Sequence, residues 1–454
     1  MRYRNGLSKP YYASTLALAV PVVVSQLGHM LVQLADTVVV GHFAGTIPLA
    51  AVSLVHSVFM VVLVLGMGVA YGLTPLIAQE NGRRNDAGCG ILLSNSLWIN
   101  TLAGIFLFCT VFFGSMAVID HLDQDPEVVR EAKPYLFILS LSLVPLMVFQ
   151  TFKQFAEGLG FTRQAMNIVL WGNVLNIILA IVFVKGMFGV PAMGVRGVGY
   201  ATLIDRCLMA LVMGIYVFRS PRFKSYLSAF CLFRVAWRST WSILRIGMPV
   251  AMQNVFEVGA FGAAALLVGT IGANEQAAHQ VAITLAATTY MMASGIGAAA
   301  AIKVGHSLGR QNSFRLRKFA SVSYAIVLLF MGMSAILFMV FSGWLPRLFT
   351  GDETVVAIAA QLLIIAGLFQ LFDGTQVVGL GILRGMGDVN VPTFITFIAY
   401  WVVGLPGGYL FGMVCGIGVN GVWYGLTLGL LMSSLLLYLR YRRTSRNLSL
   451  KAHG

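Results

Sequence analysis

The sequence predicts an all-α polytopic membrane protein with twelve transmembrane helices, arranged as two homologous six-helix lobes. Three observations carry this prediction. Of the 454 residues, 58% are hydrophobic and only 10% are charged; long uncharged stretches separate short charged loops; and several motifs recur half a chain apart. Soluble domains carry about 25% charged residues. The composition therefore excludes a soluble enzyme, a nucleic-acid-binding protein and a disordered protein.

The uncharged stretches are long enough to cross a bilayer. Residues 389–439 contain no Asp, Glu, Lys or Arg over 51 positions, and residues 87–119 contain none over 33. A helix needs about 20 mainly apolar residues to span the hydrocarbon core. The sequence predicts spans at 13–39, 49–79, 91–118, 134–156, 164–186, 197–218, 241–269, 277–305, 319–345, 355–383, 391–413 and 420–440.

The basic residues favour one side of the membrane. Twelve spans place both termini on the same side, and assigning the loops alternately puts 22 of the 30 Lys and Arg residues there. The opposite loops hold five basic residues and eight acids. The positive-inside rule therefore predicts a multi-pass protein of the bacterial inner (plasma) membrane with cytoplasmic N- and C-termini. The net charge of +14 then reflects contact with anionic lipids and requires no nucleic acid.

Short motifs indicate an internal repeat. Leu18-Ala19-Val20-Pro21-Val22 resembles Ile246-Gly247-Met248-Pro249-Val250, 228 residues later. Gly82-Arg83-Arg84-Asn85 resembles Gly309-Arg310-Gln311-Asn312 at an offset of 227. Similar offsets at separate places indicate two homologous halves.

The repeat predicts two domains. Residues 1–227 form an N-lobe with six helices and the start of a cytoplasmic linker, and residues 228–454 form a C-lobe with the remaining six helices and the tail. Because six is even, both halves enter the membrane in the same orientation. Such parallel repeats are a known transporter architecture.

Among the acids inside predicted spans, three stand out: Asp36, Glu257 and Asp373. An ionisable group at mid-bilayer costs about 2.5–3.5 kcal/mol on insertion scales, so these acids are candidate functional groups. The alternative is a structural role as buried hydrogen-bonding groups between helices. Each acid has polar neighbours at helical spacing, and we expect these side chains to face a bundle interior or a wet cavity: Gln26, His29 and Gln33 before Asp36; Gln253 before Glu257; and Gln370 and Gln376 around Asp373.

These carboxyl groups can bind a proton or, with amide oxygens, a hard monovalent cation. Glu257 and Asp373 lie in the same half and could jointly hold Na⁺. We expect a local structural role for Asp205 and Arg206, and snorkelling to the headgroups for Lys153 and Lys303. The sequence shows no phosphate-binding loop, nucleophile–base pair or His/Cys metal spacing, so we expect no cofactor beyond the coupling ion.

Several of these motifs resemble the multidrug and toxic compound extrusion (MATE) family, particularly its NorM-like branch. The resemblance covers nearly the whole chain. Its most specific pieces are Ala35-Asp36-Thr37-Val38-Val39-Val40-Gly41, Gly247-Met248-Pro249 followed by Glu257, Ala277-Ala278-His279-Gln280-Val281-Ala282, and Phe369-Gln370 with Asp373-Gly374-x-Gln376.

The resemblance implies a V-shaped pair of six-helix lobes and alternating access. It assigns cation or proton coupling to Asp36, Glu257 and Asp373, and N-lobe cavity positions to Asn176 and Thr202. One departure is evident: four residues after Asn176 the family usually has Asp or Asn, whereas this chain has Ala180. The C-lobe pair is intact, so we expect coupling there.

We therefore predict a secondary active multidrug efflux antiporter, not an enzyme. It would export amphipathic, cationic organic compounds in exchange for Na⁺ or H⁺ and function as a monomer among membrane lipids. One alternative is a lipid-linked precursor flippase of a related fold, although only Arg206 and Lys303 could meet a pyrophosphate near the core. Another is a membrane-embedded enzyme or receptor, which would need a catalytic pair or a soluble domain.

Overall fold

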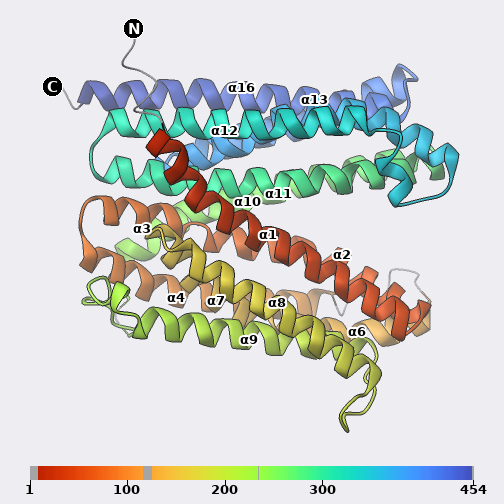
Figure 1. Ribbon diagram of the computed structural model, residues 1–454, viewed down its shortest axis with the longest axis horizontal. Helices are drawn as coiled ribbons and strands as arrows, with labels where there is room; N and C mark the ends of the chain where they lie inside the picture. The colour runs from red at the N-terminus through yellow and green to blue at the C-terminus, as the bar shows by residue number, and fades with distance from the viewer. Residues whose placement is uncertain (1–8, 116–124, 234, 452–454) are drawn as a thin grey trace. The chain divides into compact units, whose positions relative to one another are not determined.

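The computed structural model describes residues 9–115, 125–233 and 235–451. Within these ranges the chain forms helices and connecting turns, with no strand (Figure 1). The elements are α1 (Lys9–Phe43), α2 (Thr46–Ala70), α3 (Leu73–Gly82), α4 (Asp86–Cys109), η1 (Thr110–Ser115), α6 (Pro126–Leu141), α7 (Leu143–Gly158), α8 (Thr162–Lys185), α9 (Val195–Arg219), η2 (Pro221–Phe223), α10 (Trp237–Gly269), α11 (Ala273–Gly309), α12 (Ser313–Val340), η3 (Leu345–Leu348), α13 (Glu353–Gly385), α14 (Asn390–Phe397), η4 (Ile398–Gly404), α15 (Leu405–Tyr409), η5 (Leu410–Val414) and α16 (Val419–Lys451).

The structure confirms the prediction of twelve membrane-spanning helices for the part of the chain it describes. Four spans are assembled from consecutive elements: α2 with α3, α4 with η1, α6 with α7, and α14 through η5. The third span extends over Asp86–Gly114, and the last part of its predicted range, 116–118, lies outside the described residues. The ninth span, α12, ends at Val340, five residues earlier than predicted, and turns and η3 follow it.

The chain divides into two compact units. Unit 1 comprises Met1–Val23 and Met252–Gly454, and unit 2 comprises Val24–Ala251. The boundaries fall inside α1 and α10, two residues after Pro21 and Pro249 respectively. The beginning of α1 therefore belongs to the unit that contains most of the second half of the chain. The beginning of α10 belongs to the unit that contains most of the first half. The division into domains 1–227 and 228–454 describes the sequence repeat, and it stays a prediction.

Glycines allow close approach of these helix beginnings. A Cβ at Gly295 on α11 would lie 2.9 Å from the backbone nitrogen of Val23, within unit 1. A Cβ at Gly68 on α2 would lie 2.3 Å from the Cα of Ala251, within unit 2. Both distances are too short for a real Cβ. Both glycines belong to the second helix of a half, so the same packing occurs twice.

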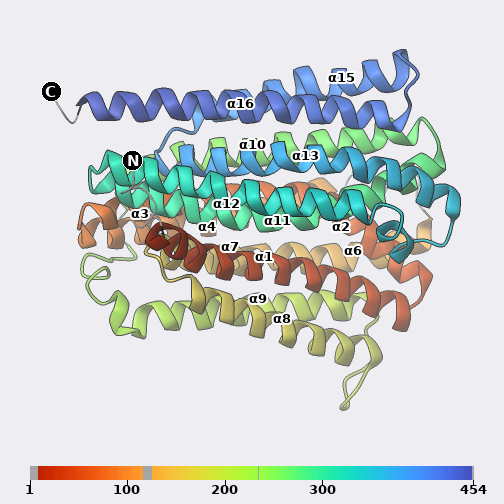
Figure 2. The same ribbon diagram turned by 45° about the horizontal axis from the view of Figure 1, so that its top comes forward.

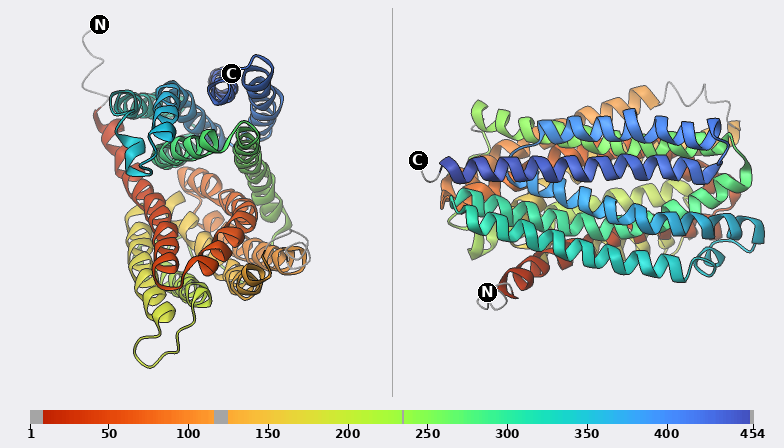
Figure 3. Two further views of the ribbon diagram at one scale, coloured as in Figure 1. Left: turned by 90° about the vertical axis from the view of Figure 1, so that its right-hand side faces the viewer. Right: turned by 90° about the horizontal axis from the view of Figure 1, so that it is seen from above.

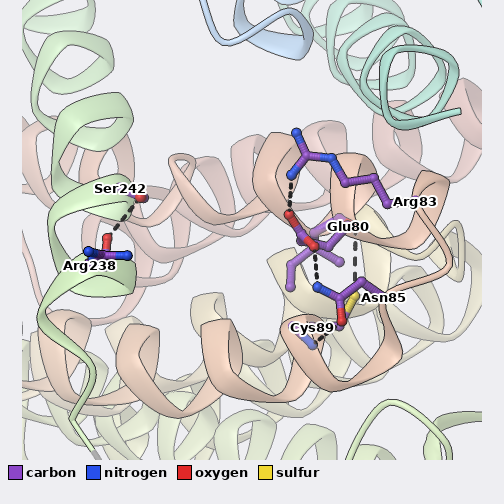
Figure 4. A network of polar contacts seen from close by, with 8 residues as sticks. Glu80, Arg83, Asn85, Cys89, Arg238 and Ser242 are labelled. Carbon is purple, nitrogen blue, oxygen red and sulfur yellow. Dashed lines mark hydrogen bonds and ion pairs between the residues drawn. The ribbon is translucent and has the colours of Figure 1, made fainter. Parts of the chain in front are cut away.

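The repeat extends to backbone geometry. Arg84 and Gln311 both adopt the left-handed conformation, with φ of 60° and 56°. The next residue in each case, Asn85 or Asn312, caps the following helix by accepting a backbone N–H bond three residues ahead, at 3.0 and 2.9 Å. In unit 2 the turn is further held by Glu80, which accepts bonds from Asn85 and Arg83 (Figure 4).

Within unit 1, α11, α12, α13 and α16 run alongside one another (Figures 1 and 2), and the end-on view in Figure 3 shows them as parts of a helix bundle. The Tyr11 ring of α1 lies 4.8 Å from the Phe319 ring of α12. Arg317 of α12 donates to the Ser445 carbonyl of α16 at 3.1 Å. The beginning of α1 and the end of α16 therefore lie at the same end of this unit.

Candidate coupling and substrate site

Glu257 on α10 lies between two tyrosine hydroxyls in unit 1. Its side chain is 6% exposed. The Tyr290 hydroxyl on α11 lies 3.2 Å from Oε2, and the Tyr400 hydroxyl on η4 lies 3.3 Å from Oε1. Each carboxyl oxygen can accept one hydrogen bond from a phenol, which offsets part of the cost of removing the carboxylate from water. The sequence prediction identified Glu257 but missed both tyrosines.

Tyr400 connects Glu257 to Gln376. Its hydroxyl also lies 3.1 Å from the Oε1 of Gln376, yet a phenol has only one hydrogen to donate. Turning the Gln376 amide resolves the conflict: Nε2, which has no other partner among the described residues, then donates to Tyr400, and Tyr400 donates to Glu257. Tyr400 belongs to the π-helical turn η4, and π-turns are frequent at functional sites.

Asp373 and Gln370 on α13 add buried polar atoms to this region. Asp373 is 3% exposed and Gln370 is fully buried. In the described part of the chain, neither Oδ1 of Asp373 nor either polar atom of the Gln370 side chain has a hydrogen-bond partner. The charges of Asp373 and Glu257 act on each other. Buried side-chain oxygens without a partner among the described residues, beside two acids, are free to bind an ion or a water molecule.

Gln253 has different partners. Its Nε2 donates to the Val389 carbonyl at 3.2 Å and to the Thr393 hydroxyl at 2.9 Å. These bonds connect α10 to the start of α14. Its predicted role in a cavity therefore stays a prediction beside this observed structural role. His279, from the motif at the start of the eighth span, accepts a bond at Nδ1 from Trp423 at 3.0 Å.

Asp36 forms the centre of a second polar region, within unit 2. Its side chain is 5% exposed, and its Oδ1 lacks a partner among the residues described. The two charged groups that act on Asp36 are Arg206 and Asp205. Arg206 donates to the Ser142 hydroxyl at 2.7 Å. Asp205 and Arg206, predicted to be structural, thus lie near a candidate functional acid.

The two N-lobe residues that the family resemblance suggested do meet. Asn176 on α8 donates from Nδ2 to the Thr202 hydroxyl on α9 at 3.3 Å. This leaves Oδ1 of Asn176, which is 1% exposed, without a partner in the described ranges. Ala180 is fully buried on the same helix and supplies no polar atom. Position 180 therefore offers no side-chain oxygen, as the sequence indicated.

The predicted polar face of α1 is only partly buried. Asp36 is buried and Gln26 and His29 are partly buried, but Gln33 is exposed. Helical geometry explains the difference, because residues three apart point about 60° away from each other. The involvement of Gln26 and Gln33 in a cavity stays a prediction.

Lys153 does not snorkel to the headgroups. Its side chain is 3% exposed, and Nζ lies 3.9 Å from Oε1 of Glu157, one turn further along α7. The expectation was wrong because it considered only the distance of Lys153 from the helix end and not the helices that pack over it. Lys303 is half-buried and donates to the Ser14 hydroxyl.

No group of three or more His, Cys, Asp or Glu side chains is placed to hold a metal within residues 9–115, 125–233 and 235–451. The acids occur instead as Glu257 with Asp373, and as Asp36 with Asp205. Twelve spans, a repeated architecture and buried acids that lack full hydrogen bonding define the class: a membrane transporter.

Comparison with known proteins specifies the family. The MatE family model matches residues 21–182 and again residues 249–410, so its two matches are offset by 249 − 21 = 228 residues. The chain is 34% identical to the multidrug resistance protein MdtK of Edwardsiella ictaluri over 440 residues, 95% of each chain. It is 33% identical over 436 residues to a probable multidrug resistance protein NorM of Idiomarina loihiensis, covering 94% of this chain and 93% of that one. The chain belongs to the MatE family.

Solved structures confirm the fold. The eukaryotic MATE transporter AtDTX14 matches with a TM-score of 0.87 at 20% identity, covering 97% of this chain and 98% of that one. An outward-facing multidrug resistance MATE family transporter of the MOP superfamily also matches with a TM-score of 0.87, at 22% identity and 97% coverage of both chains. The predicted helical membrane fold is therefore correct, and the family evidence indicates a transporter rather than an enzyme.

Proposed function

We propose that the protein is a secondary active multidrug efflux antiporter, which exports amphipathic, cationic organic compounds in exchange for Na⁺ or H⁺. The names of the multidrug resistance relatives support drugs as substrates, and the buried acids Glu257 and Asp373 support a cationic character. The observation that carries the coupling proposal is the buried pair Glu257 and Asp373, with incompletely bonded polar groups beside it. Multi-pass insertion in the bacterial inner membrane, with cytoplasmic termini and a monomeric state, completes the proposal.

In this mechanism a cation entering from outside neutralises the charge shared by Glu257 and Asp373. Before it binds, the phenols of Tyr290 and Tyr400 donate to the Glu257 oxygens. Binding of the cation competes with these bonds and releases the phenols. A ligand shifts a conformational equilibrium only through its different affinity for the two states. The acids must therefore bind the cation more tightly in one state than in the other.

The membrane potential drives export when the exchange moves net charge inward. A net movement of one elementary charge across 100 mV yields about 2.3 kcal/mol, which supports a concentration ratio of about fiftyfold. Exchange of one coupling cation for one monovalent cationic substrate moves no net charge and is driven by the concentration gradient of the coupling cation alone. Two carboxylates in one low-dielectric region also attract a cationic substrate. Substrate and coupling cation can then compete for the same negative charge, so that arrival of one promotes departure of the other. Competition of this kind requires no covalent intermediate and no nucleotide.

Purified protein in liposomes tests the proposal. A cationic fluorescent dye is loaded, and its efflux is followed after a Na⁺ gradient or a pH gradient is imposed separately. We expect one of these gradients to accelerate efflux and liposomes without protein to show no acceleration. Dye efflux that responds to neither gradient would contradict antiport.

A further inference from the structure

The segment between α9 and α10 is bound to α4 by side chains that satisfy its backbone. Three polar side chains within about one turn of α4 make these bonds. They join the Cys231 N–H to Ser94 Oγ at 3.0 Å, the Ala236 N–H to Asn95 Oδ1 at 2.8 Å, and the Leu232 carbonyl to the Trp98 indole N–H. The Thr240 hydroxyl also donates to Asn95 Oδ1 at 3.1 Å.

Hydrogen bonds of this kind are expected in a loop whose backbone has little access to water. In the cytosol, water would satisfy the backbone groups of an exposed turn at no structural cost. Near hydrocarbon, each unsatisfied backbone group costs several kcal/mol, so irregular backbone there must be bonded by protein. The side chains of α4 provide these bonds for a segment whose own side chains are nevertheless exposed.

Several of the exposed side chains of this segment are apolar or aromatic. Phe233 is 85% exposed, Val235 58%, Trp237 72% and Trp241 57%. Trp237 and Trp241 are one turn apart on α10, and their rings stack with centroids 6.4 Å apart. Tryptophan rings with exposed apolar faces are typical of the membrane–water interface. Further along α4 from Trp98, the exposed side chains are apolar and include Phe106.

The charge of the segment is entirely positive. From Arg219 to Arg245 the sequence contains six basic residues and no acid. Arg222, Lys224 and Arg238 are exposed. Basic residues near a leaflet surface attract anionic lipid headgroups, each by about fivefold. An apolar face beside an uncompensated positive surface fits an anionic phospholipid layer better than it fits water or a neutral protein.

We propose that residues 231–233 and 235–241, here called the interfacial segment, lie in the headgroup layer and bind anionic phospholipid. Trp237 and Trp241 belong to the helix that carries Glu257, which is 20 residues beyond Trp237. The lipid thus anchors the beginning of α10.

Spin-label accessibility tests the immersion of the segment. Phe233→Cys is labelled in a cysteine-free variant of the full chain that retains efflux, in nanodiscs of phosphatidylcholine and phosphatidylglycerol. Ser225→Cys, at an exposed polar position of the same connection, is the aqueous control, and Phe106→Cys on α4 is the lipid control. We expect the ratio of oxygen to nickel-chelate accessibility at position 233 to exceed that at 225 several-fold. Equal ratios at these two positions would overturn the proposal.

Lipid retention in native mass spectrometry tests the preference for anionic lipid. Arg238→Gln, at an exposed basic position of the interfacial segment, should weaken retention of phosphatidylglycerol about fivefold. Retention of phosphatidylcholine should not change. Arg196→Gln, an exposed arginine at the beginning of α9, is the matched control and should have little effect. Unchanged phosphatidylglycerol retention in Arg238→Gln would reject the anionic-lipid site, even if position 233 proves to be immersed.

Discussion

Replacing Tyr400 with Phe removes one hydroxyl and little volume from the region around Glu257. The ring still packs 5.7 Å from Phe261, so the change is confined to the hydrogen bonds. The lost hydroxyl lies 3.3 Å from Glu257 Oε1 and 3.1 Å from Gln376 Oε1. Among the described residues, the cation-free carboxylate then keeps the bond from Tyr290.

The magnitude follows from these distances. Hydrogen bonds to charged groups contribute about 1.5–3 kcal/mol, and bonds of 3.2–3.3 Å belong at the lower end of this range. About 1.4 kcal/mol corresponds to a factor of ten. Because the phenol stabilises the cation-free carboxylate, Tyr400→Phe should tighten cation binding about tenfold. Tyr290→Phe should act similarly, and the double variant should tighten binding more than the two single changes together, since the last phenol bonded to a carboxylate stabilises it most.

The assay is the cation concentration that gives half-maximal dye efflux from proteoliposomes. It should fall about tenfold in Tyr400→Phe, with slower maximal efflux because the cation is released less readily. Tyr324→Phe is the matched control: its buried hydroxyl has no partner in the described residues, so the half-maximal concentration should stay unchanged. A higher half-maximal concentration in Tyr400→Phe would refute the reasoning and make the phenol oxygen a cation ligand.

Three further changes test the packing. Gln253→Leu should lower the free energy of unfolding by about 1–3 kcal/mol in a thermal or denaturant assay, because it leaves the Val389 carbonyl and the Thr393 hydroxyl without this donor; unchanged stability would argue against the structural role. Gly425→Ala should lower the melting temperature strongly, since its Cβ would lie 2.0 Å from a backbone nitrogen of α15, whereas Gly262→Ala on α10 enters open space and should be neutral or stabilising. Lys153→Met should lower the free energy of unfolding by about 3 kcal/mol, because it leaves Glu157 buried without its partner. Adding Glu157→Gln should restore most of this loss. No recovery in the double variant would mean that the two side chains do not interact.

The twelve spans and the buried acids could be predicted from the sequence because both depend on local properties. A span needs only continuous apolar length, and an acid within it is conspicuous by its insertion cost. Asp36, Glu257 and Asp373 are all at most 6% exposed, as their positions inside apolar stretches suggested. The repeat was equally accessible, since equivalent turns need equivalent residues, as at Arg84-Asn85 and Gln311-Asn312.

The partners of these acids could not be predicted, because they come from distant parts of the chain. Tyr290 is 33 residues from Glu257, and Tyr400 is 143 residues away in an uncharged run whose hydropathy only indicated lipid. A buried tyrosine needs a hydrogen-bond partner, which is the one signal that could have identified Tyr400. For Gln253, helical spacing placed it near Glu257 but could not show that its amide bonds to α14.

The central claim is that Glu257 and Asp373 couple the cation gradient to efflux. The most direct measurement is gradient-driven dye efflux from liposomes containing Glu257→Gln or Asp373→Asn, compared with the unaltered protein at matched amounts of folded transporter. Both variants should unfold at the same temperature as the unaltered protein, yet show no acceleration when the gradient is imposed. Acceleration equal to that of the unaltered protein in both variants would contradict the claim.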